Sequence, residues 1–322
     1  MTKTVQLKLS KIKYSGDSVG RNIRVELEVL GKFSRIDKRI KAGTTAEINH
    51  EVGRFETDSG LLQADVLITV IEKDLLFNDV GNTKGNIKVN TAVTKPQQFV
   101  FEVQVREMRS IFGKFWGTKT AVFEITLEVE VLDAIRYVPD KGEGWLIVKI
   151  GDKPTKESLP DYLKVKIDRT DNKYDYFTIL EGPYRGESAF VELDKGSSQF
   201  ITGVRHEPMA RAKYSISQKI FILNGKKYKT TDYPETPWRK GLYDIEIPDA
   251  PHKGGGNYIS QSKRARTWFR IGHDGERYLH AGGFSLGCIT VIEANRWTEI
   301  YNALIKARKG DFMSVGVLEV VD

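Results

Sequence analysis

Cysteine is almost missing from this chain, since Cys288 is the only one among 322 residues. A single cysteine excludes an internal disulfide framework and any zinc site built from several cysteines. The sequence also lacks an uninterrupted apolar run near the ~20 residues that a membrane-spanning helix needs. Its N-terminus, residues 1–16, alternates apolar and polar residues and has no apolar core of a signal peptide, so we expect no export signal.

Tandem repeats, low-complexity tracts and the motifs of common nucleic-acid-binding modules are missing as well, so we expect no nucleic-acid partner. The 40% of hydrophobic and 29% of charged residues are typical of a globular protein, and the length suits two or three domains. Fifty Lys and Arg against 43 Asp and Glu give a net charge of +7. This balance favours anionic partners such as a cell-wall polymer or lipid headgroups, or it describes an ordinary solvated surface.

The strand pattern predicts a mainly β protein of three domains. Residues 1–138 contain apolar–polar alternation separated by Gly, Asp and Asn, which predicts an antiparallel β-sandwich. A stretch dense in Pro, Gly and charge at 137–144 marks a boundary. Residues 144–205 form a small β-rich connecting domain, and 206–322 form a third β domain. The strands of the first domain are expected at 5–14, 22–31, 61–72, 86–90, 98–107 and 121–132.

The third domain has clear turn and helix signals. An Asn-Gly pair at 224–225 between apolar runs predicts a hairpin. The sequence PHKGGGN at 251–257 predicts a flexible loop, and short strands are expected around Cys288. Within 293–310 the large apolar residues recur at helical spacing, followed by Gly310, which predicts one prominent helix. These apolar residues are Trp297, Ile300, Tyr301, Leu304 and Ile305.

The segment HAGGFSLGCITV, residues 280–291, combines a histidine with the lone cysteine. A thiol reacts well only as thiolate, so a nucleophilic Cys288 needs a base, and His280 is the nearest candidate. If the two flanking strands are neighbours, the glycine-rich tip between them predicts a chain reversal that joins imidazole and sulfur. The N–H of Gly287 can face a developing oxyanion, and Ser285 can bond within the loop or orient the histidine. The alternative is that Cys288 is a small buried residue.

Ser285-Leu286-Gly287-Cys288-Ile289 resembles the S-x-G-C-[IV] signature of L,D-transpeptidases, the YkuD-type catalytic domain. The short spacing from His280 to Cys288 is similar to a divergent branch that includes antibacterial effectors acting on peptidoglycan stem peptides. Residues 214–223 and 236–245 resemble the opening hairpin and following strand of the family. The usual second histidine before the glycine is Leu286 here, and the usual His-to-Cys separation is longer.

The resemblance implies cysteine-dependent acyl transfer on stem peptides without a cofactor. The thioester is resolved by water, by a D-amino acid or by a second stem peptide, and the sequence leaves these three outcomes open. His273, 15 residues before the cysteine, is the alternative base. His252 adjoins the GGG loop and is either a surface residue or part of the cleft, whereas we interpret Trp268 and Phe269 as packing residues. Three residues are candidates for holding a substrate carboxylate, namely Arg270, Arg277 and Tyr258.

Residues 70–89 resemble the strand–loop–strand around the third calcium loop of a C2 domain. Glu72, Asp74 and Asp79 stand near that family's D-x-D-x5-D spacing, and calcium prefers such oxygen ligands. The matching first loop offers only Asp17. The resemblance implies a C2-like sandwich that addresses the protein to a membrane surface or to a delivery machine, with acidic loop residues capping strand ends as the simpler interpretation.

Two classes of function follow. The first is an L,D-transpeptidase-like or L,D-carboxypeptidase-like enzyme made in the cytoplasm. Either a type VI or similar secretion machinery delivers it to the periplasm of target cells, with an immunity protein as a further partner, or it is a cytoplasmic carboxypeptidase that recycles muropeptides. The second is a non-catalytic membrane- or wall-binding module with a degenerate cysteine domain. A papain-like peptidase is disfavoured because no histidine follows Cys288.

Overall fold

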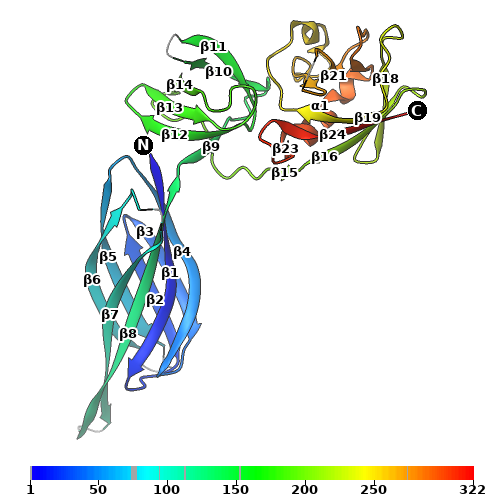
Figure 1. The fold of residues 1–322 in the computed structure, drawn as a ribbon. Helices are drawn as coiled ribbons and strands as arrows, with labels where there is room; N and C mark the ends of the chain where they lie inside the picture. Colours follow the sequence, from blue (N-terminus) through cyan, green and yellow to red (C-terminus); the bar gives the residue numbers. More distant parts are fainter. Residues whose placement is uncertain (1, 74–77, 94, 112–113, 152–153, 274) are drawn as a thin grey trace. The chain divides into compact units, whose positions relative to one another are not determined.

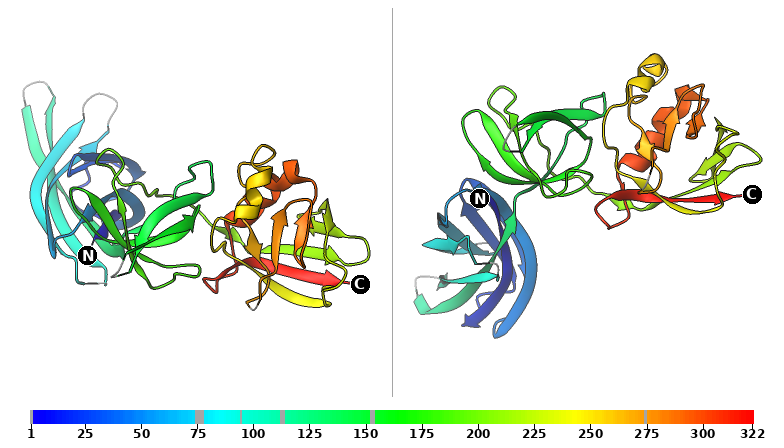
Figure 2. Two further views of the ribbon diagram at one scale, coloured as in Figure 1. Left: turned by 90° about the horizontal axis from the view of Figure 1, so that it is seen from above. Right: turned by 45° about the horizontal axis from the view of Figure 1, so that its top comes forward.

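The computed structural model describes residues 2–73, 78–93, 95–111, 114–151, 154–273 and 275–322, with the backbone alone between 107 and 118. The chain forms two compact units, Met1–Ala134 and Ile135–Asp322, which we call the first and the second unit. Figure 1 and Figure 2 show that both consist mainly of β-strands, as the sequence predicts. The division of residues 144–322 into two domains stays a prediction.

The first unit is a sandwich of two four-stranded antiparallel sheets. In spatial order, one sheet contains β4 (Thr44–Thr57), β1 (Lys3–Gly16), β8 (Lys114–Asp133) and β7 (Gln97–Ile111). The other contains β3 (Lys32–Arg39), β2 (Asn22–Val29), β5 (Leu61–Glu72) and β6 (Asp79–Asn90).

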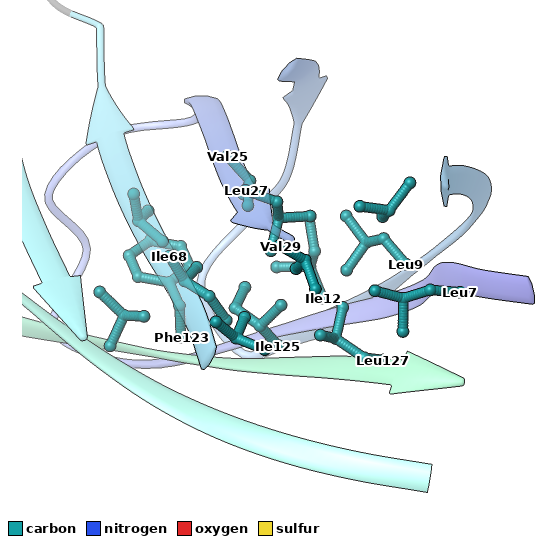
Figure 3. Close-up of a cluster of buried hydrophobic side chains, with 14 of the residues drawn as sticks. Leu7, Leu9, Ile12, Val25, Leu27, Val29, Ile68, Phe123, Ile125 and Leu127 are labelled. Atoms are coloured by element: carbon teal, nitrogen blue, oxygen red, sulfur yellow. The ribbon is translucent and has the colours of Figure 1, made fainter. Parts of the chain in front are cut away.

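One hydrophobic core joins the two sheets of the first unit. Alternate residues point inward because successive side chains of a strand face opposite sides of its sheet. From β2 the core receives Ile23, Val25, Leu27 and Val29, each at most 1% exposed. Figure 3 shows Val25, Leu27 and Val29 in one cluster with Leu7, Leu9 and Ile12 of β1 and with labelled side chains of β8.

Strands β3 and β4, each at one edge of its sheet, were not predicted from the sequence. Both are largely exposed, with burial patterns in which only one residue per strand is buried. An edge strand that faces solvent carries many charged residues and gives little apolar alternation. Polarity therefore hid these two strands from a search based on apolar periodicity.

The second unit contains a six-stranded antiparallel sheet. In spatial order its strands are β11 (Thr155–Pro160), β10 (Trp145–Ile150), β14 (Ser188–Glu192), β13 (Tyr174–Ile179), β12 (Lys164–Thr170) and β9 (Ile135–Tyr137). Asp161, directly after β11, is fully buried and accepts hydrogen bonds from Tyr301 Oη and Arg264 Nη1, both at 2.7 Å. Arg264 also pairs with Asp140. These contacts tie loops of this sheet to the C-terminal third of the chain.

A mixed eight-stranded sheet carries the segment around Cys288. In spatial order its strands are β19 (Gly241–Glu246), β24 (Ser314–Val321), β16 (Ala210–Ser215), β17 (Ile220–Leu223), β18 (Lys226–Thr231), β22 (Ile289–Val291), β21 (Tyr278–Ala281) and β20 (Phe269–Arg270). Two further strands, β15 (Glu207–Pro208) and β23 (Ala307–Arg308), pair in parallel.

Local signals of the third predicted domain are confirmed in part. Asn224 and Gly225 both have positive φ, at 50° and 75°, and join β17 to β18 as the hairpin prediction requires. Helix α1 (Trp297–Ile305) follows the short 3-10 helix η2 (Ala294–Arg296) and buries all five predicted apolar residues. In the described parts of the chain, helices are short, and none combines the length and apolar character needed to span a bilayer.

The loop predicted at 251–257 is wrong in part, because Lys253–Tyr258 forms the 3-10 helix η1. The surroundings of Gly255 explain why this position needs a glycine. A Cβ at this position would lie 2.1 Å from Ala265 O, so the helix packs closely on the backbone of Ala265. Gly255 therefore serves a close backbone approach.

Candidate functional site

An open cavity of about 660 Å³ lies around the ends of β21 and β22, and both Cys288 and His280 line it. Cys288 immediately precedes β22, and His280 is the third residue of β21. Cys288 is partly exposed, whereas the His280 side chain is only 5% exposed. The fold therefore brings the two predicted chemical groups to one cavity.

The pairing of these strands corrects the predicted chain reversal. Strands β21 and β22 are neighbours, but they are parallel, with His280 opposite Thr290 and Leu279 opposite Ile289. A parallel pair cannot be closed by a tight hairpin, so the glycine-rich segment crosses over instead of reversing. Because side chains alternate along a strand, Cys288 and Thr290 share the face on which His280 lies.

His280 is held by two hydrogen bonds that fix its tautomer. Its Nδ1 lies 3.0 Å from Ala281 O, and since a carbonyl oxygen only accepts, Nδ1 carries the proton. Its Nε2 is then the acceptor and lies 3.0 Å from Thr290 Oγ1. Burial lowers the pKa of His280 to about 4, against the smaller opposing effect of the bond to Ala281 O. The imidazole is therefore neutral at neutral pH.

The sulfur of Cys288 contacts backbone rather than an imidazole. Tyr278 N donates to Sγ at 3.4 Å, and Sγ lies 4.0 Å from Glu276 O. Among the described residues, these two are the sulfur's hydrogen-bond partners. Burial raises the pKa of the Cys288 thiol, and the Tyr278 N–H and the charge of Arg277 oppose this effect without reversing it. The resting group is a thiol.

Ser285 and Gly287 shape the turn before the cysteine. Ser285 Oγ donates to Cys288 O at 2.8 Å and accepts from Gly287 N at 3.2 Å. Two roles were expected for Ser285, bonding within the loop or orienting the histidine. Both of these hydrogen bonds lie within the loop. Gly287 has φ +115°, where a Cβ would lie 3.0 Å from Thr236 Oγ1. Its N–H, predicted to face an oxyanion, is bonded to Ser285 in this structure.

His273 lies away from the cysteine. Its Nε2 is 2.8 Å from Asp244 Oδ2 and its Nδ1 is 3.2 Å from Glu246 Oε1, and its side chain is 52% exposed. Arg270 pairs with the same Glu246 at 2.8 Å. Neither side chain lines the cavity that contains Cys288.

The other two predicted substrate ligands lie nearer. Tyr258 lines the cavity, and its hydroxyl accepts a hydrogen bond from Gly283 N at 2.7 Å. Arg277 lines a separate hollow of about 430 Å³, with its guanidinium 4.8 Å from the Trp238 ring centre. Its Nη2 donates to Thr236 O at 3.1 Å. Arg277 is therefore not among the residues that line the cavity with His280, although its charge lowers the pKa of the Cys288 thiol.

Trp268, interpreted from the sequence as a packing residue, lines the cavity. Its ring stacks on His280 at 4.1 Å and 18° and on His252 at 4.4 Å and 4°. For His252, the sequence left open whether it is a surface residue or part of the cleft. It lines the cavity and lies 3.1 Å from Asp249 Oδ1. Tyr278 Oη donates to Asp249 Oδ2 at 3.1 Å. The frequent aromatic residues in the sequence before Cys288 are the signal that could have predicted this cluster of rings.

The calcium candidates of the first unit are described only in part. Glu72 and Asp79 lie opposite each other on β5 and β6, and Glu72 is buried at 3% exposure. Asp74 lies outside the described residues. Asp17 accepts a hydrogen bond from Thr120 N at 2.9 Å. Within the described residues, no group of three His, Cys, Asp or Glu side chains is arranged to hold a metal ion.

A scan of protein-family models and a search of curated proteins both find no match to this chain. Among solved structures, a C2 domain of plant Extended Synaptotagmin 1 matches 37% of this chain and 91% of its own, with 14% identity and a TM-score of 0.22. Human GIVD cytosolic phospholipase A2 with methyl gamma-linolenyl fluorophosphonate matches 60% of this chain and 32% of its own, with 8% identity and a TM-score of 0.25. Likenesses this distant carry no argument about fold or function.

Proposed function

We propose that the second unit is a cysteine-dependent acyltransferase or hydrolase of the L,D-transpeptidase type, acting on peptidoglycan stem peptides. The observation that supports it best is that Cys288 and a neutral, tautomerically fixed His280 line one open cavity from adjacent strands. A buried histidine without such a nucleophile beside it would have only a structural role. The choice of stem peptides rests on the sequence resemblance around Cys288.

In the proposed reaction, Nε2 of His280 takes the thiol proton while Sγ attacks the carbonyl carbon before a terminal D-residue. The S–C bond forms, the C–N bond breaks, and the imidazolium returns the proton to the leaving amine. Water or another amine then attacks the thioester carbonyl and gives its proton to Nε2. The C–S bond breaks, and the imidazolium returns the proton to Sγ, which restores the thiol. Water yields a carboxypeptidase, a D-amino acid yields exchange, and a second stem peptide yields a cross-link.

The position of Thr290 offers a way to make Nε2 of His280 available as the base. Its hydroxyl lies 3.0 Å from Nε2 of His280 and 3.4 Å from Phe284 O. Rotation of the hydroxyl hydrogen from the first acceptor to the second leaves the Nε2 lone pair open to the thiol proton. The oxygen keeps a hydrogen-bond acceptor throughout, so the buried hydroxyl is never left unsatisfied.

For the first unit we propose a C2-like targeting role on a membrane surface or a delivery machine. The support is the eight-stranded antiparallel sandwich together with the sequence resemblance at 70–89. Delivery to the periplasm of target cells, neutralised by an immunity protein in the producer, belongs to the same proposal. Loss of target-cell killing when the secretion machinery is deleted tests it, and unchanged killing would contradict it.

The second candidate is a non-catalytic binding module. It is favoured by the raised pKa of the Cys288 thiol and by the bond that Thr290 makes to Nε2 of His280, since both leave the pair unreactive at rest. In that case the cavity binds a wall peptide or the sandwich binds lipid, and Cys288→Ala changes neither.

Mass spectrometry of purified muropeptides separates the two candidates. Wild type is expected to remove or exchange a terminal D-residue or to form a new cross-link, and Cys288→Ala is expected to abolish this. His280→Asn should lose most turnover, whereas the matched variant His273→Asn should retain it. Turnover by Cys288→Ala, or no turnover by wild type, would refute the enzymatic proposal, and loss in His273→Asn alone would move the base to His273.

A further inference from the structure

One face of the six-stranded sheet carries a row of cations and aromatic rings that the proposed function does not use. Its five members are paired residues on the successive strands β11, β10, β14, β13 and β12, which Figure 1 labels. The row spans roughly 19 Å, because neighbouring strands lie ~4.8 Å apart. All five side chains are exposed or partly exposed. In spatial order this cation–ring row consists of Lys156, Lys149, Phe190, Tyr176 and Arg169.

The two rings hold cations in place. Arg169 Cζ lies 3.6 Å from the centre of the Tyr176 ring, and Lys149 Nζ lies 5.5 Å from the centre of the Phe190 ring. The two ring centres are 5.8 Å apart at an interplanar angle of 31°. A cation that already rests on a ring loses less side-chain freedom when it binds an anion. The row therefore presents preorganised cations above its rings.

At one end of the row, two lysines repel each other. Lys149 and Lys156 are directly opposite residues of an antiparallel pair, where like charges destabilise a sheet. Among the described residues, neither ammonium has an ion-pair partner. Both line a hollow of about 190 Å³ together with Phe190 and with Ile147, which is 65% exposed, and the hollow contains one acidic residue, Glu192. An anion bound between the lysines would remove their repulsion.

At the other end, Arg169 has spare donors. Its Nη1 lies 3.7 Å from Asp171 Oδ2, beyond hydrogen-bond distance. The Asp171 carboxylate is held by its own turn, because its Oδ1 accepts hydrogen bonds from Lys173 N and Tyr174 N, both at 2.8 Å. The guanidinium of Arg169 is therefore available to a second anionic group.

We propose that the cation–ring row binds a linear polymer of phosphodiester-linked polyols. One phosphate lies on the lysine pair and another on Arg169, because both side-chain types bind phosphate oxygens and arginine does so bidentately. The carbon-rich polyol between the phosphates crosses Phe190 and Tyr176. A single-stranded nucleic acid matches the row less well, because its bases stack on open aromatic faces and cations lie over these rings. This site does not depend on Cys288.

Binding measurements on the full chain test the proposal. The probe is lipid-free poly(glycerol phosphate), titrated calorimetrically at physiological salt. Lys149→Gln and Arg169→Gln should each weaken binding by about 3- to 5-fold, the range of an exposed ion pair. Phe190→Leu keeps every charge but removes the ring under Lys149, so it should weaken binding by about 2-fold. Lys263→Gln removes an exposed positive charge outside the row and should bind as wild type does.

Two other polyanions decide the class of ligand, namely a single-stranded oligothymidylate and phosphatidylglycerol vesicles. Weaker polymer binding in the row variants but not in Lys263→Gln, with unchanged circular dichroism, supports the site. No binding by wild type, or equal weakening in Lys263→Gln, overturns it. Tighter binding of the oligothymidylate or of the vesicles than of the polymer overturns the choice of ligand. Lys149→Gln and Arg169→Gln alter exposed side chains, so the test does not depend on the folding of Phe190→Leu.

Discussion

Replacing Asp161 by asparagine should change how the stability of the second unit depends on pH. Burial raises the pKa of Asp161 to about 6, although the hydrogen bond from Tyr301 and the charge and hydrogen bond of Arg264 oppose it, and Asp140 adds to the rise. The folded state therefore binds this proton more tightly than the unfolded state. Its contribution to stability is present below pH ~4 and is lost as pH rises through 6.

His280 acts in the opposite direction over nearly the same interval. Burial lowers its pKa from an ordinary value of 6.5 to about 4, so the unfolded state binds the proton more tightly. Its contribution is present above pH ~6.5 and is lost as pH falls through 4. Each shift corresponds to about 3 kcal/mol of unfolding free energy, because one pKa unit is worth about 1.4 kcal/mol. In the wild type the two contributions largely cancel.

The variants expose each contribution separately. The unfolding free energy of Asp161→Asn minus that of wild type should rise by about 3 kcal/mol from pH 4 to 6.5, and the same difference for His280→Asn should fall by about 3 kcal/mol. Denaturant unfolding followed by tryptophan fluorescence measures this, because four of the five tryptophans lie in the second unit. Differences that stay constant with pH would refute the assigned protonation states, whatever the absolute stabilities of the variants.

Three further predictions concern the turn, the core and the thiol. Gly287→Ala should destabilise the second unit by about 1–3 kcal/mol in denaturant unfolding, because φ of +115° strains any side chain, and an unchanged midpoint would contradict this. Phe123→Ala should cost the first unit about 3–5 kcal/mol by circular dichroism, because the ring is fully buried against Tyr14, whereas the exposed Phe33→Ala should cost less than about 0.5 kcal/mol. Iodoacetamide should alkylate Cys288 slowly at pH 7 and faster as pH rises above the ordinary thiol pKa, followed by intact mass; fast alkylation independent of pH from 6 to 8 would show a resting thiolate.

The sequence predicted those parts of the fold that local patterns specify. Alternation located β1, β2 and β5, whose inward residues are buried, and the Asn224-Gly225 pair located a hairpin. It did not locate β3 and β4, because an edge strand is stabilised by its neighbour's backbone and carries no apolar signature of its own. Strand pairing of this kind is decided by residues distant in sequence.

The same distinction applies to the site. Local sequence singled out Cys288 and His280 because their residue types and spacing are close together in the chain. The parallel pairing of β21 and β22 depends on β18, whose Thr230 and Thr231 pair with Val291 and Thr290 some 60 residues away. The stack of Trp268 on His280 is equally a consequence of tertiary packing, so residue types alone could not predict it.

Burial favours the uncharged form of both members of the proposed catalytic pair. It raises the pKa of the Cys288 thiol and lowers that of the His280 imidazole, so both shifts oppose a resting thiolate–imidazolium pair. The charge of Arg277 lowers the pKa of the thiol without reversing the effect of burial. Under the proposed function, the proton therefore leaves Sγ as the sulfur attacks and not before.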